Sequence, residues 1–363
     1  MPITLLTLAL ISKHNPKTSL NNILIINTTG MGDTLWGTPS IRAIKKELPH
    51  VSIDVLLQPQ WKPLFYGNNN IRRLISYYPQ WYRQLLVLPK IFLTQYDHVL
   101  IFHANKDIRR ILPWLRSESF WSHQNPENFP VVPKSQIVQF DKTVHGILRR
   151  IGIINKINIP SNGTHMDIFL NDDERRNALL FLKQNGMVPK GFIYLNAGGH
   201  TPYKRWPVDK FISLAKTILQ NTSLNIMLGG GPEAVTRADS INDQLDSERV
   251  TRATHCSLRE NCALIAQARI LITPDSGPMH IGFALKVPTI ALFWTTGSEG
   301  RIRNDLNGPE YCGPLEIDKS LSSVLCGDFV DINRKIDSEK VFPNPILVED
   351  VWERALGILK SNI

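Results

Sequence analysis

The sequence lacks several features that would assign a function at once. Its few cysteines form no C-x-x-C pair and no cluster with histidine, so neither a zinc site nor a disulfide framework is indicated. This usage is typical of a reducing cytosol. No low-complexity tract and no solenoid-length repeat is present. At 363 residues, the chain is long enough to form two globular domains.

Long hydrophobic runs are also missing. The apolar run Ile3–Ile11 is too short to span a bilayer. No Lys or Arg precedes it and no small-residue cleavage site follows, which makes it a poor signal peptide. We expect a disordered or interfacial extension over residues 1–21. The protein should stay in the cytosol, with peripheral contact at a membrane as an option.

Acidic residues are scarce in the first half. Residues 1–170 hold 19 Lys and Arg against 9 Asp and Glu, a net +10, whereas residues 171–363 hold 22 against 23, a net −1. Three Arg-Arg pairs contribute to the excess, at 72–73, 109–110 and 149–150. The charge fits either a solvated surface or a domain that meets an anionic partner. No nucleic-acid-binding motif is visible, so an anionic glycolipid explains the charge better than nucleic acid does.

Short strand-like runs alternate with helical patterns in both halves. The expected strands are Ile23–Asn27, Ser52–Leu57, His98–Phe102, Phe192–Asn196, Asn225–Leu228, Ile270–Thr273 and Thr289–Phe293. The expected helices are Ser40–Leu48, Val208–Gln220, Glu233–Leu245, Leu258–Gln267, Met279–Leu285 and Val348–Lys360, and Arg116–Gln139 is expected to be a loop. This order predicts two α/β domains with doubly wound parallel sheets, facing each other across a cleft.

We place the first domain at 22–165 and the second at 171–340. A C-terminal helix at 345–363 follows, for which packing back on the first domain is one option.

Two glycine-containing loops of the second half suit a nucleotide. The loop Asn196–Pro207 offers backbone N–H groups, the hydroxyl of Thr201 and the cation of Lys204, which together suit a phosphate. The loop Leu228–Val235 places Glu233 at a helix start, where it could accept hydrogen bonds from ribose hydroxyls. The alternatives are an ordinary turn and a first-turn acid favoured by the helix dipole.

A third segment, Ile272–Leu285, is the most specific. Asp275 ends a strand, Ser276 or Gly277 caps the next helix, and Pro278 is expected at its first position. The N–H groups at such a helix start form an anion site. His280 lies one turn further along and would point back toward this site, although histidines on helices are more often packing residues.

In the first half, Asp33 follows Gly30-Met31-Gly32 directly after a buried strand. Asp33 either caps a helix or is presented to a substrate at the sheet edge.

Together these residues resemble glycosyltransferase family 9, the heptosyltransferases of lipopolysaccharide assembly. The resemblance spans roughly residues 22–300. It rests on "GMGDTLWGTPSIRAIKKELPH", the "KRWP" and "GGGPE" loops and "DSGPMHIGFALKVPTIALFW". It implies a GT-B architecture of two Rossmann-like domains, with acceptor bound by the first and nucleotide-sugar by the second. The segment "WTTGSEGRIRNDLNG" and the cysteine spacing of the tail depart from the family pattern.

The resemblance also implies an inverting, metal-independent transfer of a sugar, usually heptose from ADP-heptose, to a lipopolysaccharide core or related anionic glycan. Its implied site residues are Asp33 as catalytic base, Lys204 on the diphosphate, Glu233 on the ribose, Cys256 at the base, and Asp275, Ser276, Gly277 and His280 on phosphate and donor sugar. Such a protein would work in the cytoplasm, with the cytoplasmic face of the inner membrane as an option. No metal or other cofactor is expected.

The chemistry of such a transfer agrees with these residue types. One carboxylate takes the acceptor proton and a cation stabilises the leaving diphosphate, so no second catalytic acid is needed. We add Arg109 and Arg110 as candidate acceptor contacts. A nucleotide-sugar epimerase and a non-catalytic nucleotide-sugar- or glycan-binding protein remain the alternatives.

Overall fold

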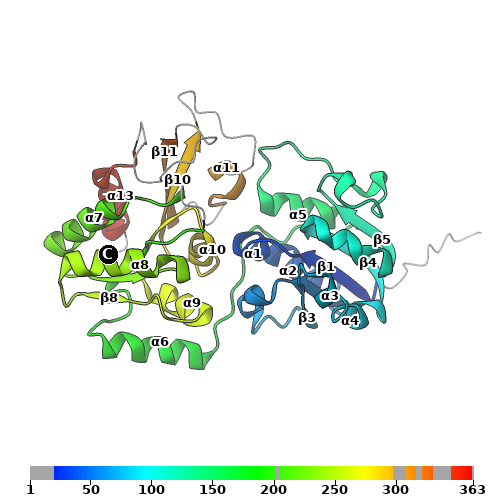
Figure 1. Cartoon of the computed structure of the whole chain (residues 1–363), viewed down its shortest axis with the longest axis horizontal. Helices are drawn as coiled ribbons and strands as arrows, with labels where there is room; N and C mark the ends of the chain where they lie inside the picture. Colours follow the sequence, from blue (N-terminus) through cyan, green and yellow to red (C-terminus); the bar gives the residue numbers. More distant parts are fainter. Residues whose placement is uncertain (1–19, 201–203, 297–307, 316–320, 330–344, 362–363) are drawn as a thin grey trace, which may run out of the picture.

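The protein folds into two α/β domains, each built on one parallel sheet (Figure 1). The computed structural model describes residues 20–200, 204–296, 308–315, 321–329 and 345–361. The strand order is β3-β2-β1-β4-β5 in the first sheet and β11-β10-β9-β6-β7-β8 in the second. The predicted pair of doubly wound sheets is confirmed.

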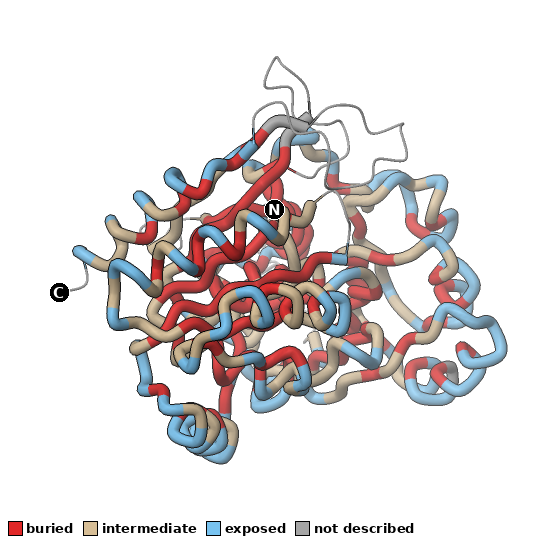
Figure 2. The backbone as a smooth tube through the Cα atoms, turned by 60° about the vertical axis from the view of Figure 1, so that its left-hand side comes forward, coloured by how far each residue is buried: buried red, intermediate tan, exposed pale blue. Residues whose placement is uncertain are grey.

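The first sheet contains β1 (Asn22–Asn27), β2 (Ser52–Leu57), β3 (Arg73–Ser76), β4 (Gln95–His103) and β5 (Arg116–Ser122). Its described α-helices are α1 (Met31–Leu35), α2 (Thr38–Glu47), α3 (Trp81–Gln84), α4 (Leu88–Phe92) and α5 (Gly146–Asn155). Helices cover both faces of this sheet (Figure 1), which explains why the apolar residues of its central strand β1 are fully buried. Buried residues gather in the interior of the molecule and exposed ones on its outside (Figure 2). The loop expected over Arg116–Gln139 is wrong at its start, because Arg116–Ser122 forms the edge strand β5.

The second sheet contains β6 (Phe192–Asn196), β7 (Asn225–Gly229), β8 (Val250–Arg252), β9 (Ile270–Pro274), β10 (Thr289–Thr296) and β11 (Ser322–Phe329). The accompanying α-helices are α6 (Asp172–Gln184), α7 (Val208–Asn221), α8 (Val235–Leu245), α9 (Leu258–Gln267), α10 (Gly277–Ala284), α11 (Pro309–Cys312) and α13 (Val348–Ser361). All strand pairings are parallel, so the strand ends carrying the predicted loops lie at one edge of the sheet.

The C-terminal helix α13 stays with the second domain. Val351 and Ala355 are fully buried in the same core cluster as the apolar face of α7, and Trp206 donates a hydrogen bond to the carbonyl of Ile346 at 3.1 Å. The option that this helix returns to the first domain is therefore wrong. Its apolar stripe is already covered by α7, β10 and β11.

A different segment reaches the first domain. Helix α11 places the ring of Tyr311 5.5 Å from Trp36, and the Arg149 guanidinium lies 5.1 Å from the centre of the Tyr311 ring. Nε2 of His145 lies 3.0 Å from the carbonyl oxygen of Gly313. The domains also meet where α1 packs on α10. There a Cβ added to Gly32 would lie 2.6 Å from Nε2 of His280, so only glycine fits.

The Arg-Arg pairs of the first half divide by role. Arg72 and Arg73 both pair with the buried carboxylate of Asp54, at 2.7 and 2.5 Å. The side chains of Arg149 and Arg150 are buried, whereas those of Arg109 and Arg110 are exposed. Much of the basic excess therefore stabilises the fold, and the interpretation of all three pairs as an anion-binding surface is too broad.

Within the described residues, no helix is both long and apolar enough to cross a membrane. The apolar run Ile3–Ile11 lies outside the described residues.

Candidate functional site

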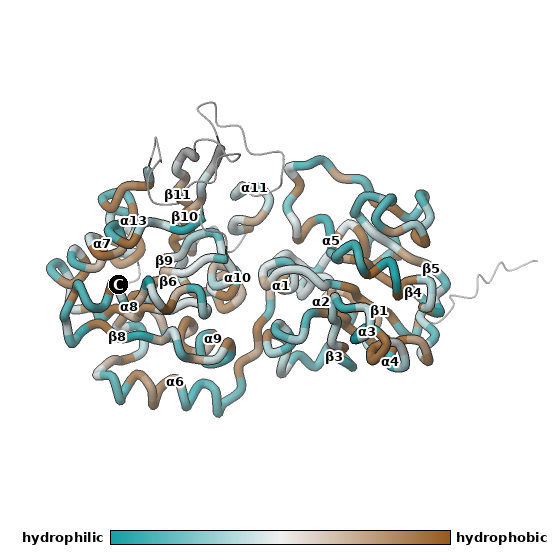
Figure 3. Tube along the Cα trace, in the orientation of Figure 1, coloured by the Kyte–Doolittle hydropathy of each residue, from teal (hydrophilic) through white to brown (hydrophobic). Residues whose placement is uncertain are grey.

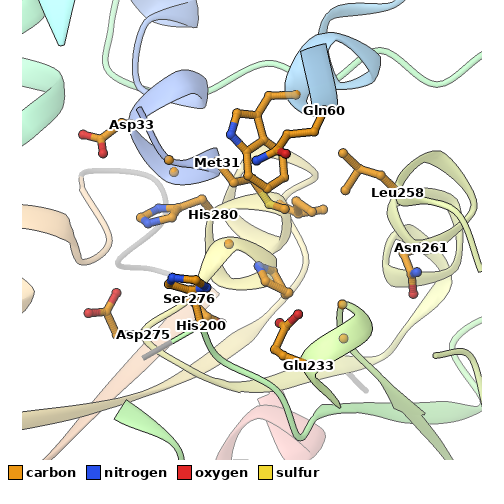
Figure 4. Close-up of a pocket in the computed structure, with 18 of the residues that line it drawn as sticks. Met31, Asp33, Gln60, His200, Glu233, Leu258, Asn261, Asp275, Ser276 and His280 are labelled. Atoms are coloured by element: carbon orange, nitrogen blue, oxygen red, sulfur yellow. The ribbon is translucent and has the colours of Figure 1, made fainter. Parts of the chain in front are cut away.

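A cavity of about 950 Å³ lies between the two domains, at the carboxyl ends of both sheets. It brings together Asp33 of the first domain and seven predicted residues of the second, namely Lys204, Glu233, Cys256, Asp275, Ser276, Gly277 and His280. Figure 4 shows His280 between the carboxylates of Asp33 and Asp275. Residues far apart in the sequence thus line one space, as a two-substrate site requires.

Asp33 does not cap a helix. It is the third residue of α1, which has Gly30 as its N-cap and no side chain capping its N–H groups. The Asp33 carboxylate instead accepts a hydrogen bond from Arg150 at 3.1 Å, and Nδ1 of His103 lies 3.1 Å from the same oxygen. The Asp33 side chain is 23% exposed and lines the cavity, so it is held and still accessible.

The charge of Asp33 is set by these two neighbours. Burial raises the pKa of the Asp33 carboxyl, but the neighbouring His103 and Arg150 outweigh burial and hold its pKa well below the usual range. Arg150 is fully buried and also donates to the carbonyl of Gly146 at 2.8 Å. Asp33 is therefore ionised throughout the neutral pH range, with a fixed orientation.

His280 is a neutral hydrogen-bond donor to the cavity. Its Nδ1 lies 3.3 Å from the indole Nε1 of Trp36, and an indole N–H can only donate, so the ring proton is on Nε2. Burial lowers the pKa of His280 to about 4. The Trp36 contact comes from the other domain, which means that the tautomer of His280 depends on the domain arrangement.

The start of α10 is free to bind an anion. Ser276 is the N-cap, but its hydroxyl donates to the carbonyl of Pro274 at 3.1 Å and accepts from Asn196 at 2.9 Å. No side chain therefore caps the first turn, which lines the cavity. The helix begins at Gly277, so Pro278 is its second residue and not the first as predicted.

A lysine–aspartate pair lies beside this helix start. Nζ of Lys204 is 2.5 Å from a carboxylate oxygen of Asp275, and both side chains are largely buried. The thiol of Cys312 donates to the other Asp275 oxygen at 3.8 Å. Burial, together with Asp275, raises the pKa of Cys312 well above its ordinary value, so the thiol keeps its proton. The ammonium group of Lys204 is thus held in place by a neighbouring carboxylate.

Glu233 lies close to several loop glycines. It belongs to the short turn Pro232–Ala234 before α8, is exposed, and lines the cavity. A Cβ added to Gly198 would lie 3.0 Å from a Glu233 carboxylate oxygen, and Gly230 has φ = +130°, a conformation that favours glycine. The absence of a side chain at these glycines lets the backbone approach Glu233 and Ala234 closely.

The far end of the cavity is partly apolar. Cys256, Leu258 and Ile265 line it, together with Tyr194, whose hydroxyl donates to Asn261 at 2.6 Å. Burial raises the pKa of the Cys256 thiol, so this group contributes an uncharged surface. Such a surface suits the flat face of a nucleobase.

Three predicted residues remain outside this arrangement. Thr201 lies outside the described residues. Arg109 and Arg110 are not among the cavity-lining residues. Sequence reasoning also missed several residues that line the cavity or hold its side chains, namely Trp36, Gln58, Gln60, Trp61, His103, Arg150, Asn196, His200 and Tyr311. For most of these no local motif exists, although His103 directly follows the predicted strand His98–Phe102 and is the last residue of β4.

In the described part of the chain, no group of three or more His, Cys, Asp or Glu side chains is placed to hold a metal ion.

Comparison with known proteins identifies the family. Residues 135–304 match the family model described as "Glycosyltransferase family 9 (heptosyltransferase)". The resemblance of the chain to glycosyltransferase family 9 is thereby confirmed. The chain is also similar to lipooligosaccharide heptosyltransferase 2 of Haemophilus influenzae, with 25% identity over 343 residues that cover 88% of this chain and 92% of the relative.

Solved structures show that the fold is GT-B. A family 9 glycosyltransferase from Veillonella parvula superposes with a TM-score of 0.79 at 22% identity, over 94% of this chain and 98% of that one. Heptosyltransferase WaaC of E. coli, solved with ADP, superposes with a TM-score of 0.67 at 15% identity, over 93% of this chain and 98% of that one. The GT-B architecture implied by the sequence motifs is confirmed.

Proposed function

We propose that this family 9 glycosyltransferase transfers heptose from ADP-heptose to a hydroxyl of a lipopolysaccharide core or a related anionic glycan, with inversion and without a metal ion. The names of the relative from Haemophilus influenzae and of the ADP-bound enzyme from E. coli support the sugar and the nucleotide. The carrying observation is geometric: Asp33 on the first domain faces the α10 start and Lys204 on the second across one cavity.

The donor lies along the second domain in this proposal. The adenine contacts Cys256 and Leu258, and the ribose hydroxyls donate to Glu233. The diphosphate meets the N–H groups at the start of α10 and the ammonium group of Lys204. His280, neutral and carrying its proton on Nε2, donates a further hydrogen bond to the donor on the side that faces Asp33.

The acceptor hydroxyl attacks the anomeric carbon from the side of the first domain. The new C–O bond forms as the bond to the diphosphate breaks, and the hydroxyl proton passes to the Asp33 carboxylate. A carboxylate with a depressed pKa is a weak base, so proton transfer comes late, after C–O bond formation has made the hydroxyl acidic. The charge that develops on the diphosphate is stabilised by Lys204 and α10.

Arg109 and Arg110 belong to the short turn Lys106–Arg110, which follows the cavity residue His103. We propose that they contact anionic groups of a large acceptor beyond the cavity. Charge reversal at both should raise the acceptor KM without changing donor affinity. An unchanged acceptor KM would make the pair ordinary surface.

The test of the function combines binding and turnover. ADP-, GDP-, UDP- and TDP-sugars are compared by thermal shift, because a donor that binds the native state raises its melting temperature. The preferred donor is then incubated with core oligosaccharide, with and without EDTA, and the anomeric configuration of the product is determined by NMR. Turnover without acceptor would indicate an epimerase instead. Loss of transfer with EDTA and recovery with magnesium would contradict the metal-independent mechanism.

A further inference from the structure

The first domain exposes an unusual cluster of large apolar side chains. The segment Trp81–Leu93 contains α3 and α4, and six of its residues are exposed large hydrophobics, namely Trp81, Tyr82, Leu85, Leu86, Phe92 and Leu93. We call these six residues the apolar patch. Figure 3 shows α4 and the chain around it as a strongly hydrophobic part of the first domain.

The apolar patch is presented by an anchored scaffold. Gln84, Val87 and Ile91 point inward, with exposures of 3% or less, and Val87 and Ile91 join the core cluster beneath β4. Gln84 also donates to the carboxylate of Asp107 at 3.3 Å, which ties α3 to the neighbouring turn Lys106–Arg110. The outward side chains of Leu86 and Leu93 are 68% and 75% exposed. The segment thus has apolar residues on both sides, and only its inner side is covered by the fold.

The charge around the patch is mainly positive, although Arg72 and Arg73 pair with Asp54 and Asp107 lies in the neighbouring turn. Residues 55–96 contain five Lys or Arg and no Asp or Glu. Arg83 and Lys90 are exposed within the patch segment itself, and Arg83 lies 5.5 Å from the centre of the Tyr78 ring. The turn tied to α3 adds exposed Lys106, Arg109 and Arg110. Basic side chains therefore border the apolar surface and are not balanced by nearby acids within the segment.

We propose that the apolar patch docks on an anionic lipid bilayer. Trp and Tyr suit the headgroup region, Leu and Phe suit the outer acyl region, and flanking Arg and Lys are attracted to anionic headgroups. A second copy of the chain on the same face would bring cations opposite cations, which disfavours self-association there. The first domain, which carries Asp33, is thereby held at the membrane surface.

The test measures binding of the full-length protein to vesicles by sedimentation. Vesicles of phosphatidylglycerol with phosphatidylethanolamine are compared with neutral phosphatidylcholine vesicles, at low and high salt. Wild-type protein should bind the anionic vesicles, and more weakly at high salt. Trp81→Ser/Leu86→Ser should lower the partition coefficient roughly tenfold or more, and Arg83→Gln/Lys90→Gln several-fold with a weaker salt dependence.

A matched control uses the exposed leucines of α6 in the second domain. Leu179→Ser/Leu180→Ser removes side chains that are 43% and 50% exposed and should bind vesicles as wild type does. Because Trp81 and Leu86 are mainly exposed, their variant should keep the wild-type melting temperature; Leu93→Ser gives an independent second test. Wild-type binding by the patch variants would overturn the proposal.

Two other outcomes would also overturn it. If Leu6→Ser/Leu8→Ser alone abolishes vesicle binding, the apolar run Ile3–Ile11 is the membrane contact and the patch is not. If wild type does not bind vesicles and sedimentation velocity shows a dimer that Trp81→Ser/Leu86→Ser dissociates, the patch is a protein interface.

Discussion

Replacing Asp33 by asparagine tests the central assignment. Asparagine keeps the size and shape of the side chain but cannot accept the acceptor proton. Loss of a general base lowers the rate by roughly 10²–10⁴-fold, which corresponds to about 3–5 kcal/mol in the barrier. Because Asp33 caps no helix, asparagine costs no capping energy. Donor affinity should stay near the wild-type value, since the proposed donor-binding residues lie on the second domain.

The same substitution leaves the buried guanidinium of Arg150 without its counter-charge. Removing one partner of a buried pair costs about 3–5 kcal/mol, and less here because the Asp33 side chain is 23% exposed. We expect a folded protein whose melting temperature is a few degrees lower. Asp33→Asn/Arg150→Met should recover part of this stability, because the uncompensated charge is gone, and should remain inactive.

Arg150→Met alone reports on the pKa of the base. Burial raises the pKa of Asp33 and Arg150 is one of the two groups that oppose it, so the variant should show an acid limb of kcat/KM at higher pH than wild type. The assays are single-turnover transfer over pH 4–8 and thermal unfolding. A folded Asp33→Asn enzyme that keeps most of its transfer rate would refute the role of Asp33 as the base. If the stability loss of Asp33→Asn/Arg150→Met equals the sum of the losses of the two single variants, the charge pair is refuted.

Three further outcomes are expected. Lys204→Ala should weaken ADP binding and slow transfer, because the diphosphate loses its cation; calorimetry with ADP checks this, and unchanged affinity would remove Lys204 from the site. The free energy of unfolding should fall as the pH drops from about 6.5 to 4, since His280 binds a proton in the unfolded state before the folded state does. From the two pKa values this effect contributes at most about 3 kcal/mol. A His280→Gln protein whose unfolding free energy has the same slope against pH would contradict it. Gly32→Ala should reduce transfer more than Gly277→Ala, because the new methyl group meets the buried His280 ring in the first case and the flexible Met31 side chain in the second; equal activities would contradict that packing.

Sequence patterns predicted the parts of the fold that depend on buried strands. Ser52–Leu57, Phe192–Asn196 and helix Leu258–Gln267 have the predicted bounds, because continuous apolar runs and a Ser-x-x-Glu capping box are local signals. The four edge strands β3, β5, β8 and β11 were all missed. The β5 sequence RSESFWS is half exposed and mixes polar with aromatic residues, so it carries no buried-strand pattern.

The site residues also differ in whether a local sequence pattern indicates them. Second-domain residues such as Asp275 and Glu233 lie in glycine-containing loops just past strand ends, where sequence position alone predicts a ligand contact. Arg150 lies in the interior of α5, 117 residues from its partner Asp33. In the sequence Arg150 appears only as half of a basic pair, and its burial depends on tertiary packing that no local pattern encodes. Tyr311 was missed for the same reason.

The contact between α1 and α10 links the separation of the two domains to the positions of Asp33 and His280. At Gly32 the backbone of the first domain approaches the His280 ring with no side chain between them, and Trp36 from the same helix fixes the proton of that ring. A separation of the domains by the width of one side chain would break this hydrogen bond and move Asp33 away from the donor. In the proposed mechanism, opening for substrate exchange would therefore also separate Asp33 from the donor-binding residues. With Asp33 as the proposed base, an open enzyme with donor bound would have no base in place to activate water, which would protect the sugar nucleotide from hydrolysis before an acceptor arrives.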